Sequence, residues 1–237
     1  MLLHKLTMHL RSQNWFAVGL EFIIVVVGIF VGLQADAWNE NRKERIRERV
    51  AMERLLADYT VNAESIGRMV EFHVDKADEL AFAMNTLIRG EIAPDEVLRF
   101  RNAFVSMFQL PPLGATMGGY DAMIGSGDLA LIQSQTLKAK LVSLNANLDA
   151  EQSLLDYFRN NNVLDMQTVK DLVQVVPNED RTDAVLQVDF DAAKDDFRIL
   201  TIVSSQRRNH QLFGRVRRDL AAEFEETSTQ IKQLLDE

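Results

Sequence analysis

Apolar residues form one uninterrupted run near the start of the chain. Residues 22–33 contain no polar side chain. A helix from Trp15 to Trp38 would be roughly 34 Å long at about 1.5 Å per residue. This length matches a hydrocarbon core of about 30 Å with an indole ring at each interface. The pattern therefore predicts a transmembrane helix over residues 15–38, preceded by a tail over residues 1–14.

A second pattern begins at Leu56, where apolar residues alternate at steps of three and four. This repeat is typical of a helix that packs along a nearly parallel partner. No proline precedes Pro94, so we expect one long helix over residues 39–90, which Gly90 ends. We favour packing within one bundle over an intermolecular coiled coil, because two alanines and a histidine would make a weak dimer seam. The repeat consists of Leu56, Tyr59, Ala63, Ile66, Val70, His73, Ala77, Leu80, Met84 and Leu87.

Residues 91–237 continue the helical pattern with interruptions. Ser134 is a suitable N-cap for a long helix. We expect that helix to be kinked or interrupted at residues 160–162, and a further helical stretch over residues 163–176 to end before Pro177. Strand-like alternation occurs only at residues 185–190 and is too short to predict a strand.

A glycine-rich loop precedes these helices, and one more helix closes the chain. Five of the eleven glycines lie between Pro111 and Gly127, which predicts a loop region broken by a short helix. The last helix is expected over residues 197–235. The predicted fold class is all-α, an N-terminal transmembrane helix running into an antiparallel helical bundle. The buried face predicted for the last helix holds Leu212, Val216, Leu220, Phe224 and Ile231.

Glu21, Gly28, Gly32 and Ala35 form a stripe along the predicted membrane helix, because spacings of seven and four return to nearly the same angle. We call this set the transmembrane stripe. Small residues four apart let a second helix approach closely, and a carboxyl group inside a membrane tends to face protein. The stripe thus predicts a helix-packing interface. The alternative is that the glycines are incidental and that Glu21 extends to the headgroups.

Residues at the ends of the apolar run suit the membrane surface. Trp15 and Trp38 are the predicted aromatic interface residues. Arg42 and Lys43 follow at the position where cations meet anionic headgroups. The bilayer is accordingly the first expected partner.

A cleaved signal peptide is the alternative explanation of the same segment. Lys5 and Arg11 form a basic start, and residues 35–37 form a small-x-small site with cleavage after Ala37. Glu21 argues against cleavage, because it would place an acid beside the apolar stretch.

The apolar run has a characteristic start and exit. Gly19-Leu20-Glu21 precede the GI-containing run, and the exit is formed by Leu33-Gln34, Trp38-Asn39-Glu40 and Arg42-Lys43. This pattern resembles that of a family of bacterial single-span membrane proteins of unknown function. Residues 120–132 match a second family pattern, a short helix followed by a glycine stop and an apolar restart. Residues 35–37 depart from the family. The resemblance implies attachment to the bacterial inner membrane and a helical body, and it implies no activity.

Two arguments about orientation conflict. Lys and Arg are more numerous after Trp38 than before Trp15, and the distribution of these cations favours a cytoplasmic body. The resemblance implies an anchor with its N-terminus inside. We place the body in the periplasm, with the cytoplasm as the alternative.

Charge and residue inventory exclude several functions. The net charge of −9 falls entirely on residues 39–237, which would repel nucleic acid. The absence of cysteine excludes disulfides, thiolate zinc sites and a cysteine nucleophile. No metal-binding spacing, phosphate loop or dinucleotide motif occurs. We therefore predict no catalytic residues, no metal ligands, no cofactor and no nucleic-acid partner.

Two features of the body stay open at the sequence level. His73 lies on the apolar stripe, where a core histidine or a pH-responsive packing residue is expected rather than a ligand. Arg207, Arg208, Arg215 and Arg218 fall on one side of the last helix. We favour their pairing with the acidic residues 179–196 over binding to an acidic external partner.

The function predicted is that of a membrane-anchored binding or scaffold protein, an accessory subunit of a membrane assembly with no catalysis. Its second partner is another transmembrane helix, either from a second copy in a homo-oligomer or from a different protein. The first alternative is a sensor-like bundle that responds to a ligand or to pH, and the second is an exported soluble protein.

Overall fold

The computed structural model of the protein describes residues 15–177 and 184–236. It divides after Val50 into two units, residues 1–50 and 51–237. Lys5, Arg11 and the rest of the predicted tail lie outside the described residues. The described part is all-α apart from one two-stranded sheet, as the sequence predicts.

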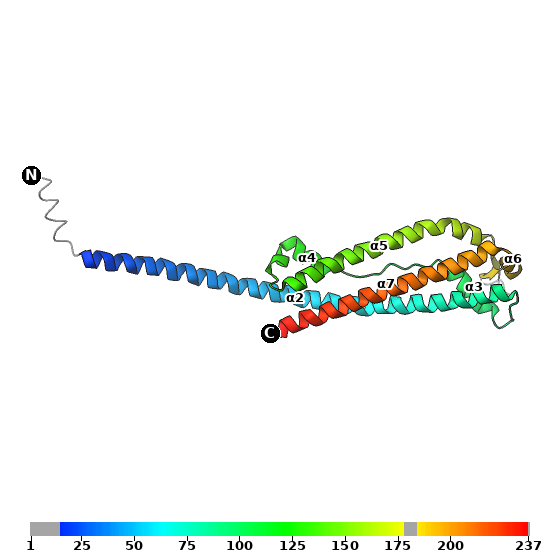
Figure 1. Ribbon diagram of the computed structural model, residues 1–237, viewed down its shortest axis with the longest axis horizontal. Helices are drawn as coiled ribbons and strands as arrows, with labels where there is room; N and C mark the ends of the chain where they lie inside the picture. The colour runs from blue at the N-terminus through cyan, green and yellow to red at the C-terminus, as the bar shows by residue number, and fades with distance from the viewer. Residues whose placement is uncertain (1–14, 178–183, 237) are drawn as a thin grey trace, which may run out of the picture. The chain divides into compact units, whose positions relative to one another are not determined.

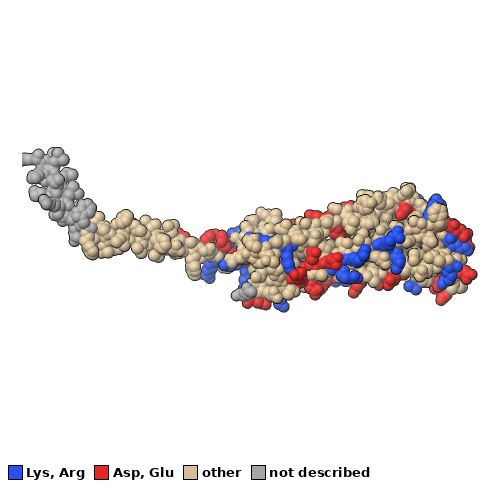
Figure 2. Space-filling model, in the orientation of Figure 1, with Lys and Arg blue, Asp and Glu red and all other residues tan. Residues whose placement is uncertain are grey.

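Helix α2 (Trp15–Arg89) contains the described residues of the first unit and extends past Val50 into the second (Figure 1). Its apolar stretch is long enough and apolar enough to cross a membrane, and no part of this stretch is buried against other residues. The visible face of this stretch is almost free of charged side chains (Figure 2). In a soluble protein such an apolar helix would be packed against other residues. The uncovered stretch is therefore compatible with a membrane anchor.

Three long helices form the body: the second part of α2, α5 (Gln135–Lys170) and α7 (Phe197–Asp236). Figure 1 shows them lying along one another. Leu55 near the start of this part of α2 and Leu141 of α5 share a core cluster with Ile231 near the end of α7. Leu87 and Val169, at the other ends of α2 and α5, cluster with Ile199. Helix α7 therefore runs antiparallel to both α2 and α5, which run parallel to each other.

The apolar repeat predicted over residues 56–87 of α2 faces this core. Six of its residues are buried and none is exposed. The helix ends at Arg89, and Gly90 follows with φ of 73°, a left-handed conformation that glycine adopts without a steric penalty. The buried members are Tyr59, Ile66, His73, Ala77, Leu80 and Leu87.

An extended segment, residues 107–117, returns the chain from one end of the bundle to the other and makes the parallel arrangement of α2 and α5 feasible. Its carbonyl groups are held by helix side chains. The carbonyl of Leu110 accepts hydrogen bonds from Arg159 at 2.6 and 3.1 Å. Asn62 binds both the carbonyl and the N–H of Thr116, at 2.7 and 2.9 Å. Hydrogen bonds from side chains thus satisfy backbone groups of this segment that a helix would have paired within its own backbone.

Shorter elements complete the body. They are α3 (Val97–Ser106), α4 (Gly118–Ser126), a 3₁₀ turn η1 (Asp128–Leu131), strands β1 (Val173–Pro177) and β2 (Ala184–Val188), and α6 (Phe190–Asp195). The two strands are antiparallel, with Val173 opposite Val188 and Pro177 opposite Ala184. Helix α4 and the glycine stop after it confirm the predicted short helix in the loop.

The structure differs from two expectations about residues 160–190, because the predicted helix is not interrupted at residues 160–162 and does not continue to residue 176. Helix α5 passes through residues 160–162 without a break, because Asn162 turns inward and its amide oxygen accepts a hydrogen bond from Gln206 at 2.9 Å. The helix then ends at Lys170, and the β-branched residues beyond it pair with residues 184–188 as a hairpin. Each strand is too short to be predicted from the alternation of apolar and polar residues alone.

The buried face of α7 differs from the prediction, although the bounds of the helix agree with it. Leu220, Phe224 and Ile231 are buried as expected, whereas Leu212 and Val216 are only half-buried. The neighbouring positions, among them Phe213 and Arg217, occupy the core in their place. The pattern of apolar residues predicts the wrong buried face here, because several core-facing positions of α7 are polar. They are Gln206, Asn209, His210 and Arg217.

Candidate functional site

The transmembrane stripe is uncovered along its whole length. Glu21, Gly28, Gly32 and Ala35 are all exposed within the chain. A Cβ atom built at Gly28 or at Gly32 would find nothing within 4 Å. The stripe is therefore a smooth helical surface with an acidic residue near one end. No other described residue of this chain packs against it.

The predicted membrane-interface residues lie on the same helix. Trp38 is 68% exposed, and Arg42 is exposed as well. Lys43 forms an ion pair with Glu40 at 3.2 Å. Helix α2 begins at Trp15, whose side chain lies outside the described residues.

A pair of histidines that sequence patterns do not reveal lies in the core of the body. His73 of α2 and His210 of α7 are fully buried, and their Nδ1 atoms are 2.8 Å apart. Nε2 of His210 lies 3.1 Å from the carbonyl oxygen of Met107. A carbonyl only accepts, so His210 carries its hydrogen on Nε2 and accepts at Nδ1. His73 must then donate from Nδ1, which leaves its Nε2 without a hydrogen.

Nε2 of His73 has no hydrogen-bond partner among the residues that the structure describes. Burial lowers the pKa of His73 to about 3, with Arg217 and His210 adding to the effect. Burial also lowers the pKa of His210, and nearby Lys76 and Arg217 act in the same direction, while the hydrogen bond to Met107 opposes them. Both rings are therefore neutral at neutral pH.

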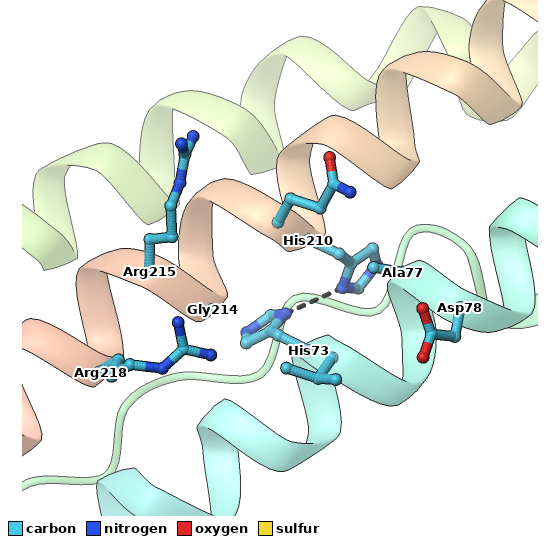
Figure 3. A pocket seen from close by; sticks show the side chains of 9 residues that line it. His73, Ala77, Asp78, His210, Gly214, Arg215 and Arg218 are labelled. Carbon is cyan, nitrogen blue, oxygen red and sulfur yellow. Dashed lines mark hydrogen bonds between the residues drawn. The ribbon is translucent and has the colours of Figure 1, made fainter.

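A groove between α2 and α7 opens over this pair, with a volume of about 430 Å³. Gly214 lacks a side chain at the point where a Cβ would lie 3.6 Å from the Cβ of His73. In Figure 3 the guanidinium group of Arg218 points toward the ring of His73, Arg215 points away from it, and Asp78 lies on the opposite side of the pair from Arg218. The lining consists of His73, Val74, Ala77, Asp78, His210, Gln211, Gly214, Arg215 and Arg218.

A buried ion pair lies next to the histidines. The Nη2 atom of Arg217 is 2.8 Å from Oε1 of Glu151 on α5 and also donates to the carbonyl of Pro111 at 2.8 Å. Both side chains are essentially inaccessible. The pair joins α5, α7 and the extended segment at the middle of the bundle.

The arginines predicted to pair with the acidic stretch do not do so within the described residues. Asp191 pairs with Lys194 and Asp196 with Arg198, whereas Arg208 donates to Ser204 of its own helix at 2.9 Å. Figure 2 shows Lys and Arg side chains gathered over the middle of α7. None of the ion pairs within residues 15–177 and 184–236 includes Arg215 or Arg218. Residues 179–183 of the acidic stretch lie outside the described residues.

The histidine pair does not by itself form a metal site. No group of three or more His, Asp or Glu suited to a metal ion occurs in the described part of the chain. The two Nδ1 atoms are, moreover, already joined by a shared hydrogen. The pair is better understood as a buried hydrogen-bonded unit bordering the groove.

The fold and these surfaces define a helical protein with one helix able to cross a membrane. Comparison of the chain with protein-family models, with curated proteins and with solved structures finds no match. The indications of function therefore come from the chain's own residues.

Proposed function

We propose that the protein is a membrane-anchored helical binding or scaffold protein and works as an accessory subunit of a membrane assembly. The observation that carries the proposal is the bare apolar stretch of α2, of which no part is buried within the chain. Hydrocarbon is the environment that such a surface prefers. The inner membrane of a bacterium is the proposed location, supported by the resemblance of the anchor and its exit to bacterial single-span proteins.

The transmembrane stripe is the proposed contact with a second helix. Packing between membrane helices depends on close backbone approach, which Gly28 and Gly32 allow. Glu21 on the same stripe gains a protein environment when the helices associate. The partner is a second copy or another protein, and no catalytic step is part of the proposal.

Replacing both Gly28 and Gly32 by Ile should weaken this association at least about tenfold, since the added side chains keep the backbones apart. The measurement is native mass spectrometry of the full chain purified in mild detergent, with the fraction of assembled protein followed on dilution. The matched control replaces Val26 and Phe30 by Ile. These residues have the same spacing and lie about 160–200° around the helix from Gly28. Equal assembly in both double variants would contradict the proposed contact.

A second candidate function has an observation of its own. The buried histidine pair beneath an open groove favours a sensor-like bundle that responds to a ligand or to pH. Co-purification separates the two candidates. A stoichiometric protein partner supports the assembly subunit, and a solitary protein stabilised by a small molecule supports the sensor.

A further inference from the structure

The α2–α7 groove has the size of a small-molecule site. Its volume of about 430 Å³ lies within the range of about 300–1,000 Å³ that such sites occupy. Both walls belong to long helices of the bundle, so the groove exists before any ligand arrives. Gly214 deepens it directly over His73.

The groove carries two arginines that have no ion-pair partner among the described residues. Arg215 and Arg218 are exposed on its α7 side and form no ion pair with the described residues. Guanidinium groups bind carboxylates and phosphates through paired hydrogen bonds. Arg218 points toward His73 (Figure 3), so its charge falls inside the groove rather than on the surface around it.

The floor of the groove holds an unused buried nitrogen. Buried polar atoms are nearly always hydrogen-bonded, yet Nε2 of the fully buried His73 has no partner in the described structure. This nitrogen accepts a hydrogen as it stands and donates one once it is protonated. Protonation would leave the hydrogen bond from Nδ1 to His210 intact.

We propose that this groove binds a small anion bearing a carboxylate or a phosphate group, held by Arg218 and by a proton taken up at Nε2 of His73. The inference deepens the second candidate function by naming its ligand class. It is independent of the anchor and of any protein partner.

The charges around His73 explain why its ring takes up a proton when an anion binds. His210 and Arg217 face the ring from α7, and both oppose its protonation. Lys76 adds positive charge near His210, while Glu151 of α5 is committed to Arg217. Asp78 lies in the groove but on the side away from Arg218. A bound anion supplies the missing negative charge, and by linkage the proton strengthens anion binding to the same extent.

Calorimetric titration of the full chain in detergent tests this inference, with sulfate and succinate as probes at constant ionic strength. Sulfate keeps one charge state over the range, so any pH dependence belongs to the protein. Its affinity should rise by up to about tenfold per unit as the pH falls from about 6 to 4, the range between the raised pKa of His73 in the complex and its pKa of about 3 in the free protein. Nitrogen NMR of the imidazoles should show His73 becoming protonated as sulfate binds.

Three variants make the assignment specific. Arg218→Gln should weaken sulfate binding at least about tenfold. Arg208→Gln, on the same helix but outside the groove, should leave it unchanged. His73→Asn keeps a donor toward His210 and should bind sulfate with little dependence on pH.

Failure of both probes to bind at millimolar concentration would overturn the inference. Equal losses in the Arg208 and Arg218 variants would do so as well, because they would reduce the effect to general charge. A pH dependence that survives in His73→Asn would also refute the role of this nitrogen. None of these results bears on the membrane anchor, so the proposed assembly role would stand.

Discussion

Replacing Arg217 by Met should lower the free energy of unfolding by about 3–5 kcal/mol, because Glu151 would remain as an uncompensated buried charge. The guanidinium group is fully buried and donates to Glu151 through Nε at 2.9 Å. It also holds the carbonyl of Pro111, so the substitution loosens the extended segment at the same time. Urea unfolding of the full chain in detergent, followed by circular dichroism, measures the loss.

Two further variants separate the charge effect from the packing effect. Replacing Arg217 and Glu151 together by Met should recover a large part of the loss, since apolar pairs often match buried ion pairs in stability. Arg215→Met, on the exposed side of the same helix, should change stability by less than about 0.5 kcal/mol. A loss below about 1 kcal/mol for Arg217→Met would mean that the pair does not organise the core as described.

Acidification should destabilise the body well before its carboxylates titrate. The pKa of His73 is about 3 in the folded protein and that of His210 is also lowered, whereas an unfolded histidine has a pKa near 6.5. The unfolded chain therefore binds more protons below about pH 6.5. The stabilisation is fully present above that value and is lost as the pH falls toward 3. At about pH 5 the loss from His73 is about 2 kcal/mol.

The pH dependence of unfolding between about pH 6.5 and pH 5 isolates this effect, because the shifted carboxyl groups titrate lower. Urea midpoints of the wild type should fall steadily through this range. In His73→Asn the slope should be smaller by an amount that approaches about 1.4 kcal/mol per pH unit near pH 5, which corresponds to one proton. Identical slopes in the two proteins would show that His73 is not held neutral by burial.

Local signals in the sequence predict much of the fold. The run of residues 22–33 predicts the bare helix, the repeat on α2 predicts its buried face, and Gly90 predicts its end. Ser134 caps α5 as expected, its hydroxyl accepting from the N–H of Leu137 at 3.2 Å. Each of these features depends on residues near one another in the chain, where spacing and capping rules apply.

Long-range polar contacts were not predictable in the same way. His73 and His210 are separated by 137 positions, and neither has a helical neighbour that would indicate a site. The repeat on α2 predicts that His73 is a core residue, but its pairing with His210 depends on α2 and α7 lying side by side in the fold. The sequence does not predict the burial of Arg217, because a buried arginine interrupts the apolar pattern of its helix. A polar residue at a core position of a long helix is the one signal that could have drawn attention to it.

For the transmembrane stripe, the spacing in the sequence predicts which residues share a face of the helix but not what packs against that face. The described part of the chain leaves Gly28 and Gly32 uncovered. The helix that we propose to pack against Gly28 and Gly32 would therefore belong to a second copy of the chain or to another membrane protein.

The central claim is that residues 15–38 stay in the mature protein and anchor it in an assembly. Intact mass and native mass spectrometry on protein extracted from membranes with mild detergent test it most directly. The account predicts a membrane-bound chain that still carries these residues, with a fixed number of copies or a foreign subunit attached. A soluble chain that begins at Trp38 would contradict it, and the helix-packing interface would be lost with the anchor.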